Sequence, residues 1–463
     1  MSKDTKKKKI RSKEKNQLPA HLEHINRMAA GIDIGSGSHF VAVPEGCDEV
    51  NVREFKSFTP DLMELAAWLK KCKIETVVME STSVYWIPLF ELLDSKGFEV
   101  KLVDARHVKN VSGRKTDVLD CQWLQRLHTY GLLNGAYRPN EQTCILRSYL
   151  RQRSMLIEEA SRYIQRMQKA LSQMNVQLHN VISDITGETG QKIIRSIVSG
   201  ERDPKILASY RNYRCKNSVE VIEKSLIGNY RAEHIFALTQ ALELYDTYQE
   251  KILACEGEIQ KHLSTFQTRE VSKHSKGIVD VSAKKKSQSH CKNELSFDAQ
   301  SHLIRITGVN LTKIPGIEAS SALRVISEIG LDLTDFKSAK QFSSWLGLCP
   351  GNKVSGGKIL SGKTKRTGNR AASILRIAAS TLHQSQSALG AFFRRLKSRL
   401  GAPKAITAAA HKLATILFNM LKNGVEYAET GQDYYEKQYR DRLITNLSRR
   451  AKTLGFKLVE STS

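Results

Sequence analysis

Hydrophobic and polar residues change their spacing several times along the chain, and each change marks an expected element. Residues 29–44, AAGIDIGSGSHFVAVP, alternate like a strand that enters a hairpin at Gly35 and Gly37. Further on, DLMELAAWLKKC and WIPLFELLDSKG have helical spacing, whereas ETVVMEST and EVKLVDA have the composition of strands. Strands that alternate with helices predict an α/β domain at 29–138, with a largely parallel sheet and an antiparallel hairpin at its start.

The stretch GRKTDVLDCQWLQRLH, from Gly113 to His128, predicts the last helix of this domain. Asp117 and Asp120 share one face of that helix, because residues three apart are neighbours on a helix surface. The apolar residues expected on its buried side are Val118, Leu119, Trp123, Leu124 and Leu127.

The region 139–265 predicts two long helices. Apolar residues from Leu146 to Leu178 recur at helical spacing, and Leu238, Tyr245, Ile252 and Ile259 fall on a seven-residue repeat. An antiparallel hairpin, an intermolecular coiled coil and a plain helical bundle all fit this pattern. Residues 180–230 interrupt the two helices.

Four further segments complete the expected organisation. Residues 1–28 form a basic disordered tail, and residues 266–300 form a Lys/Ser-rich linker. Residues 301–430 are expected to be a second, mainly helical globular domain, followed by a charged helical tail at 431–463. Within this second domain, LTKIPGIEASSALRVISEIG predicts a segment like a helix-hairpin-helix, whose backbone N–H groups suit a phosphate. A plain helical corner is the alternative.

The charge of the chain points to a polyanionic partner. The 463 residues carry a formal net charge of +25, which favours nucleic acid, although a merely basic protein such as a ribosomal one has the same property. No apolar run approaches the roughly 18 residues of a membrane span. The eight cysteines have no zinc-site spacing, which fits reduced thiols in the cytoplasm.

Four acids form a candidate metal site. Asp33 and Glu80 end two predicted strands, where functional groups of open α/β sheets gather, and Asp117 and Asp120 begin the following helix. Such oxygen ligands suit Mg²⁺, with Mn²⁺ as the alternative ion, and paired ions would serve phosphoryl transfer. Helix capping would equally explain the helical pair, and Asp104 is a rival ligand.

A stretch without acids provides the second candidate site. Residues 336–425 contain no Asp or Glu, which favours a surface along a phosphate backbone. Within it, Ser355 precedes two glycines and is a candidate nucleophile, although a loop serine is the plain alternative and Ser361 is an equal candidate. The cations expected to bind nucleic acid are Lys353, Lys358, Lys363, Lys365, Arg366, Arg370 and Arg376.

Taken together, these motifs resemble the insertion-sequence 110 family of transposases, specifically its 1111 subgroup. GIDIGS, VVMESTSVYW and KTDVLDCQWL carry the resemblance in the first domain, and IPGI, WLGLCP, SGG and GN carry it in the second. The resemblance implies a RuvC-like RNase H fold with an acidic tetrad at Asp33, Glu80, Asp117 and Asp120, a coiled-coil domain, and a transposase domain with Ser355 as nucleophile.

The resemblance also implies a reaction and its partners. A family member exchanges DNA strands through a covalent phosphoserine–DNA intermediate, guided by a noncoding bridge RNA that pairs with donor and target DNA. Dimers would assemble into tetramers in the bacterial cytoplasm, at the nucleoid. Three alternatives stay open: a RuvC-like junction resolvase that hydrolyses DNA without Ser355, a nucleic-acid-binding protein without activity, and an actin-like ATPase. The sequence GIDIG would also fit the phosphate loop of such an ATPase.

Overall fold

The structure is a computed structural model that describes residues 24–103, 117–133, 135–270, 293–365 and 367–459. The side chains of Asp117, Lys353 and Ile359 also lie outside the description, and so do all atoms of Asp104 and Arg366. The chain divides into two units, the first ending at Arg138 and the second beginning at Pro139.

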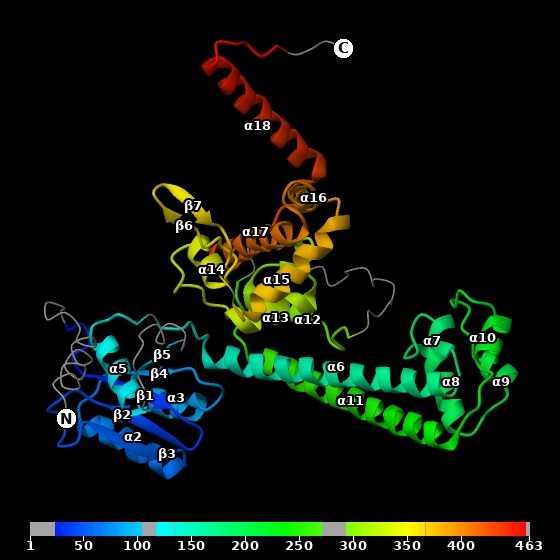
Figure 1. Ribbon diagram of the computed structural model, residues 1–463, viewed down its shortest axis with the longest axis horizontal. Helices are drawn as coiled ribbons and strands as arrows, with labels where there is room; N and C mark the ends of the chain where they lie inside the picture. The colour runs from blue at the N-terminus through cyan, green and yellow to red at the C-terminus, as the bar shows by residue number, and fades with distance from the viewer. Residues whose placement is uncertain (1–23, 104–116, 134, 271–292, 366, 460–463) are drawn as a thin grey trace, which may run out of the picture. The chain divides into compact units, whose positions relative to one another are not determined.

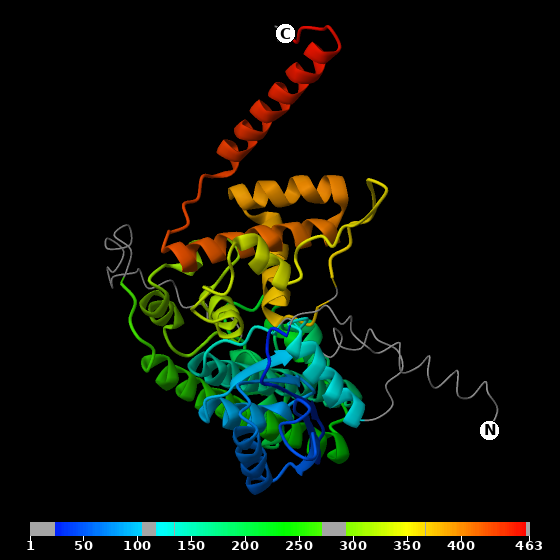
Figure 2. The same ribbon diagram turned by 90° about the vertical axis from the view of Figure 1, so that its left-hand side faces the viewer.

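The first unit is built on a five-stranded sheet with the order β3-β2-β1-β4-β5 (Figure 1), and Figure 2 shows the same unit, in blue and cyan, from the side. The strands are β1 (Ala29–Ile34), β2 (Ser38–Ala42), β3 (Val52–Lys56), β4 (Thr76–Glu80) and β5 (Glu99–Val103). β1, β4 and β5 run parallel, whereas β2 and β3 are antiparallel to their neighbours. The sheet is therefore mixed: it has the expected parallel strands and the expected initial hairpin, and β3 adds a second antiparallel pairing at the edge.

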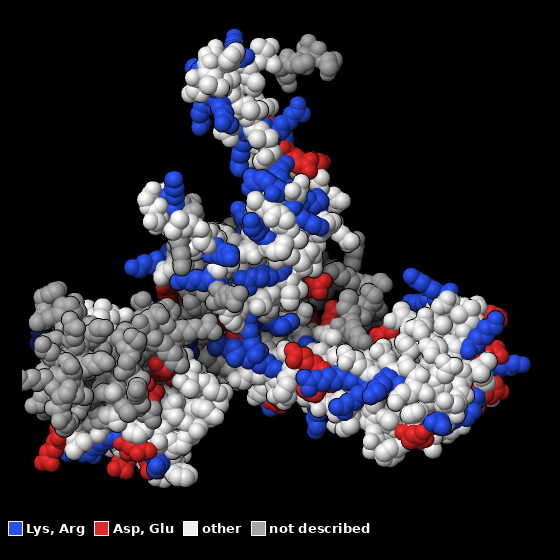
Figure 3. Space-filling view, viewed as in Figure 1, with Lys and Arg blue, Asp and Glu red and all other residues white. Residues whose placement is uncertain are grey.

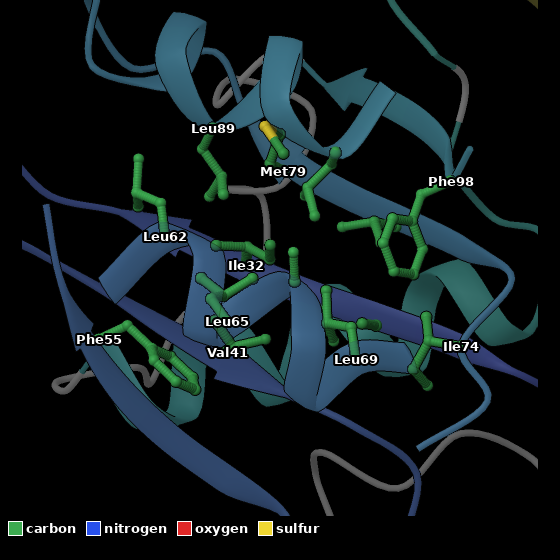
Figure 4. Close-up of a cluster of buried hydrophobic side chains, with 14 of the residues drawn as sticks. Ile32, Val41, Phe55, Leu62, Leu65, Leu69, Ile74, Met79, Leu89 and Phe98 are labelled. Atoms are coloured by element: carbon green, nitrogen blue, oxygen red, sulfur yellow. The ribbon is translucent and has the colours of Figure 1, made fainter. Parts of the chain in front are cut away.

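Helices α2 (Thr59–Lys71) and α3 (Trp86–Ser95) cover one face of this sheet. Figure 4 shows their apolar side chains meeting those of the strands, with Leu65 and Leu69 of α2 close to Ile32 of β1. Proline within the first turn of α2 and Asp61 beside it favour the start of that helix, since neither conflicts with its unpaired N–H groups. This face holds the main core of the unit.

Helix α5 (Asp117–Thr129) packs on the other side of β1 and β4. Its buried residues are Cys121, Leu124, His128 and Thr129, and Leu124 contacts the strand residues of a smaller apolar cluster. The expectation for this helix was partly wrong, because the side chains of Val118 and Leu119 are 39% and 47% exposed. Val118 and Leu119 lie outside the face of α5 that contacts β1.

In the second unit, α6 (Glu141–Gln173) and α11 (Ala232–Ser264) form an antiparallel hairpin within one chain. Contacts at successive levels fix its register, from the hydrogen bond between Gln142 and Thr265 to the aromatic contact between Tyr163 and Tyr248. A buried ion pair joins Arg153 Nε to Glu256 Oε1 at 2.6 Å. The hairpin is thus the arrangement adopted among those that the heptad pattern left open.

The segment between α6 and α11 folds as a helical cap on the end of this hairpin where α6 ends and α11 begins (Figure 1). Its helices are α7 (Leu178–Val181), α8 (Glu188–Val198), α9 (Pro204–Ser209) and α10 (Val219–Ser225). Ile193, Leu207 and Ile222 are fully buried in a core shared with Met167 and Leu238 of the long helices. The cap therefore buries the ends of α6 and α11.

The remainder of the second unit is mainly helical. Its elements are α12 (Ala299–Thr307), the 3₁₀ turn η1 (Leu311–Lys313), α13 (Ala319–Ile329), α14 (Ala339–Trp345), β6 (Lys353–Ser355), β7 (Lys358–Ser361), α15 (Arg370–Thr381), the 3₁₀ turn η2 (Leu382–Gln384), α16 (Ala388–Leu400), α17 (Ala402–Asn423) and α18 (Gln432–Thr453). Within the described residues, no helix is both long and apolar enough to cross a membrane.

The segment expected to resemble a helix-hairpin-helix departs from that expectation on its first side. The residues before the Pro315–Gly316 turn form only the 3₁₀ turn η1, and the preceding helix is α12. Gly316 has a φ of +83°, and an added Cβ would lie 2.7 Å from Ala378 O of α15. The glycine therefore serves both the turn and its close packing on α15.

Candidate functional site

Asp33 and Glu80 lie on adjacent parallel strands at the same edge of the sheet. Ile32 pairs with Met79, and the same register continued by one residue places Asp33 beside Glu80. Ile32 and Met79 belong to the core under α2 and α3. Because side chains alternate along a strand, Asp33 and Glu80 face the opposite side, which α5 covers. Both acids are half-buried.

Helix α5 approaches this side unusually closely because Gly31 has no side chain. A Cβ at Gly31 would lie 2.5 Å from Cys121 O and 2.8 Å from Gln125 Cα, and closer still to Gln125 N. These are backbone atoms that cannot rotate away. Gly31 therefore fixes α5 against β1 and brings the first turns of the helix to the edge that carries Asp33 and Glu80.

Cys121 is fully buried on α5, next to Gly31 of β1. Burial raises the pKa of the Cys121 thiol to about 12, and the negative charges of Asp33 and Asp120 contribute to the increase. By strand register Asp33 and Glu80 lie on the sheet face that α5 covers, and Asp120 is half-buried on α5. Neither Gly31 nor Cys121 was expected as a site residue; the glycine within a strand was the available signal.

The fourth acid of the predicted tetrad and its rival are not among the described side chains. Asp117 is the first residue of α5, one turn before Cys121, but its side chain lies outside the description, as does Asp104. Among the described side chains, no three His, Cys, Asp or Glu lie close enough to hold a metal ion. The three acids therefore offer oxygen ligands of the kind that Mg²⁺ prefers, without forming a complete ligand set themselves.

Ser355 lies in the second unit, at the end of a tight β-hairpin. It pairs with Lys358 across a loop of two glycines, Gly356 and Gly357, with φ values of +55° and +76°. Two positive φ values in a two-residue loop are typical of a type I′ turn. The glycines therefore have a conformational reason to be present, and the Ser355 side chain is exposed at the base of the turn.

The hairpin distinguishes the two serine candidates. Ser361 Oγ accepts a hydrogen bond from Lys363 N at 3.3 Å, and Ser361 is half-buried. Ser355 is exposed and lies directly beside the turn, where a phosphate can approach it. The geometry therefore favours Ser355 as the more accessible hydroxyl.

The predicted nucleic-acid-binding cations occupy the hairpin, the loop after it and α15. Lys358, Lys363, Lys365 and Arg370 are exposed, whereas Arg376 is half-buried. The side chain of Lys353 and the whole of Arg366 lie outside the description. Figure 3 shows Lys and Arg outnumbering acids over the part of this unit that contains α14 to α18. Such a surface suits a phosphate backbone.

Comparisons with known proteins find two family matches. A DEDD-type transposase model of the IS110 family matches residues 30–176, and a model described as transposase of the IS116/IS110/IS902 family matches residues 309–394. The first match contains all four predicted acids, and the second contains Ser355. Together they span about half of the chain. No curated protein matches it.

Proposed function

We propose that this chain, an IS110-family DNA transposase by its two matched domains, exchanges DNA strands by using the acids of the first unit and Ser355 of the second. The observation that supports the proposal is the position of Asp33 and Glu80 at the ends of adjacent strands, on the sheet face that α5 covers, with Asp120 half-buried on α5. Ligands of open α/β sheets bind at the carboxyl ends of the strands, so carboxylates at this edge are well placed to hold a cation.

The acids would hold divalent cations. Asp33 and Glu80 would provide oxygen ligands from the sheet, and Asp120, with Asp117, would provide them from α5. Mg²⁺, or Mn²⁺ in its place, would supply positive charge that stabilises the phosphate oxygens and helps to ionise an attacking hydroxyl. Gly31 and the close packing of α5 keep the two sets of ligands at a fixed separation.

Ser355 would act as the nucleophile. Its Oγ attacks the scissile phosphorus, and a serine–phosphate ester forms as the bond from phosphorus to the leaving-strand oxygen breaks. The serine proton passes to solvent or a nearby base, and the leaving oxygen takes up a proton to become a free hydroxyl. Attack by the hydroxyl of an exchanged strand then reverses the step and releases Ser355. The ester conserves the energy of the phosphodiester, so that no high-energy cofactor is needed.

The basic surface of the second unit would hold the nucleic acids. Residues 336–425 lack acids, and the exposed cations of the hairpin and α15 would neutralise the phosphates near Ser355. We extend the proposal to guidance by a bridge RNA and to dimers that assemble into tetramers, as in the family that the motifs resemble. The high net positive charge supports an RNA partner in addition to DNA.

A hydrolytic endonuclease of the RuvC type is the second candidate. The observation that favours it is the type I′ turn, which accounts for Gly356 and Gly357 without a catalytic serine. In that case the acids alone would promote attack by water, and Ser355 would be a hairpin residue.

Trapping a covalent adduct distinguishes the two candidates. The protein purified with its RNA would be incubated with Mg²⁺ and DNA bearing the ends and the target of its element, and a protein–DNA adduct would be sought on a denaturing gel. We expect the adduct with wild type and with Ser361→Ala, and its loss in Ser355→Ala and Asp33→Asn. Cleavage without an adduct, unchanged in Ser355→Ala, would leave the hydrolytic candidate. Loss in Ser361→Ala alone would assign the nucleophile to Ser361.

A further inference from the structure

The loop that follows Glu80 is held in one conformation. Ser81 donates to Val103 O from both its backbone N–H and its hydroxyl, at 3.1 and 3.2 Å. Ser83 has a φ of +51°, a conformation that a residue other than glycine rarely adopts. The indole of Trp86 donates to Ser83 O at 3.1 Å. These contacts fix the loop between β4 and α3 at both ends.

Trp86 and Phe90, the aromatic residues of α3, pack against each other and against Arg138, whereas Tyr85 is exposed. The guanidinium of Arg138 lies 4.3 Å from the ring centroid of Phe90 and 6.0 Å from that of Trp86. In contrast, Tyr85 is 44% exposed and its neighbour Val84 is 62% exposed. A fixed loop therefore presents an aromatic ring to solvent at the edge of the sheet that carries Asp33 and Glu80.

We propose that Tyr85 stacks on an unpaired base of the DNA strand that enters the acidic site. This inference rests on the proposed function, because it takes the acids as the place where the phosphate reacts. Strand exchange requires nucleotides that have left their duplex, and an unstacked base exposes an apolar face that an aromatic ring can cover. A ring tolerates any base, since every base has a π face, so Tyr85 would position the strand without reading its sequence.

The position of the ring favours DNA over a protein partner. Val84 and Tyr85 belong to the loop that directly follows Glu80, so a protein docked on them would restrict the approach of a substrate to the acids. A nucleotide next to the reacting phosphate would instead bring its base to the loop that follows Glu80. The fixed backbone around Ser83 reduces the conformational entropy lost on binding, because the loop is already ordered. Tyr85 is thus a positioning residue rather than a catalytic one.

Photo-crosslinking tests the inference on the full-length protein. The probe would be a single-stranded oligodeoxynucleotide of mixed sequence containing 5-iododeoxyuridine, which crosslinks to aromatic side chains in stacking contact, and elevated salt would suppress phosphate contacts. We expect the crosslinked peptide to contain Tyr85. Tyr85→Phe should retain the crosslink, whereas Tyr85→Leu should lose it and weaken binding of the probe by roughly 5-fold or more.

Tyr213 provides a matched control. It is a tyrosine of the second unit, 78% exposed, with the guanidinium of Arg214 5.4 Å from its ring centroid. Tyr213→Leu should change neither the crosslink at Tyr85 nor the affinity. Crosslinks that map elsewhere and persist in Tyr85→Leu would overturn the inference. So would a change in oligomeric state in Tyr85→Leu with the crosslink pattern unchanged, because Tyr85 would then serve a protein contact.

The outcomes separate this inference from the proposed function. A covalent adduct in wild type together with an unaffected crosslink in Tyr85→Leu would refute the role of Tyr85 and leave strand exchange in place. A crosslink at Tyr85 without any adduct would support stacking and refute the serine reaction. Equal melting temperatures of Tyr85→Leu and Tyr85→Phe would establish that the comparison concerns binding rather than folding.

Discussion

Replacing Gly31 by alanine would push α5 away from β1. The new Cβ would lie 2.5 Å from Cys121 O and 2.8 Å from Gln125 Cα, whereas carbon atoms in comfortable contact are about 3.5 Å or more apart. Both obstacles are backbone atoms of one helix, so that no side-chain rotation relieves the clash. The helix must therefore move by about 1 Å, or the strand must bend by the same amount.

Two effects of this movement can be estimated. Overpacking of a well-filled core costs about 1–3 kcal/mol, and occasionally more, so we expect the melting temperature to fall. The same movement would carry Asp120 away from Asp33 and Glu80. A misplacement of about 1 Å at an active site can cost on the order of 100-fold in rate, so the loss of activity should exceed the loss explained by unfolding.

Gly37→Ala is the matched control, because an added Cβ there meets nothing within 4 Å and the backbone φ is not in the left-handed region. Thermal unfolding and the yield of covalent adduct would be measured for both variants at a temperature where both are folded. Gly31→Ala should be less stable than Gly37→Ala and form much less adduct. Equal stability and equal adduct formation would refute the idea that Gly31 sets the distance between α5 and the acids.

Three further predictions concern other parts of the chain. Burial lowers the pKa of His128 to about 4 from its ordinary 6.5, so the folded state resists protonation of this side chain. The free energy of unfolding should therefore be nearly constant above pH 6.5 and fall by about 2 kcal/mol by pH 5. Urea titrations should show this fall in wild type and not in His128→Gln. Removing one partner of the buried pair, as in Glu256→Ala, should cost about 3–5 kcal/mol in urea unfolding, whereas the double replacement Arg153→Met with Glu256→Met should recover most of that loss; a larger loss in the double variant would contradict this. In the turn between β6 and β7, Gly356→Asn should retain adduct formation, because asparagine tolerates the left-handed region, whereas Gly356→Val should reduce it strongly. Equal yields of adduct would show that the turn does not position Ser355.

The parallel centre of the sheet and its hairpin were predictable because β1 and β4 are almost entirely buried. β1 and β4 consist mostly of buried apolar residues, and the glycines after β1 indicate the hairpin. β3 was missed because only Phe55 of its five residues is buried, so that it lacks a hydrophobic pattern. Its pairing with β2 is what makes it a strand, and a single-sequence pattern does not contain that information.

The long helices were predictable as helices, but their pairing was not. A heptad pattern specifies an apolar stripe and leaves open whether the partner is the same chain or another. The structure settles on an intrachain hairpin through contacts between distant residues, such as Arg153 with Glu256 and Gln142 with Thr265. These pairs become neighbours only after the cap has reversed the direction of the chain.

The candidate site was predictable in part. The ends of β1 and β4 follow from the strand pattern, and parallel pairing then brings Asp33 and Glu80 together. The orientation of α5 was not predictable, because Gly31 rather than the hydrophobicity of Val118 and Leu119 decides which face of the helix meets the sheet. The turn at Gly356 and Gly357 was readable as a hairpin signal, but the flanking strands are too short and polar to stand out.

The convergence of the acids is tested most directly by Mn²⁺ binding, followed by electron paramagnetic resonance of the free ion. Wild-type protein should reduce the signal of free Mn²⁺, and Asp33→Asn, Glu80→Gln and Asp120→Asn should each lose most of this binding while they remain folded. Asp94→Asn, which changes an exposed acid on α3, should bind as wild type does. Undiminished binding in Asp33→Asn and Asp120→Asn would contradict a shared metal site at the edge of β1 and β4.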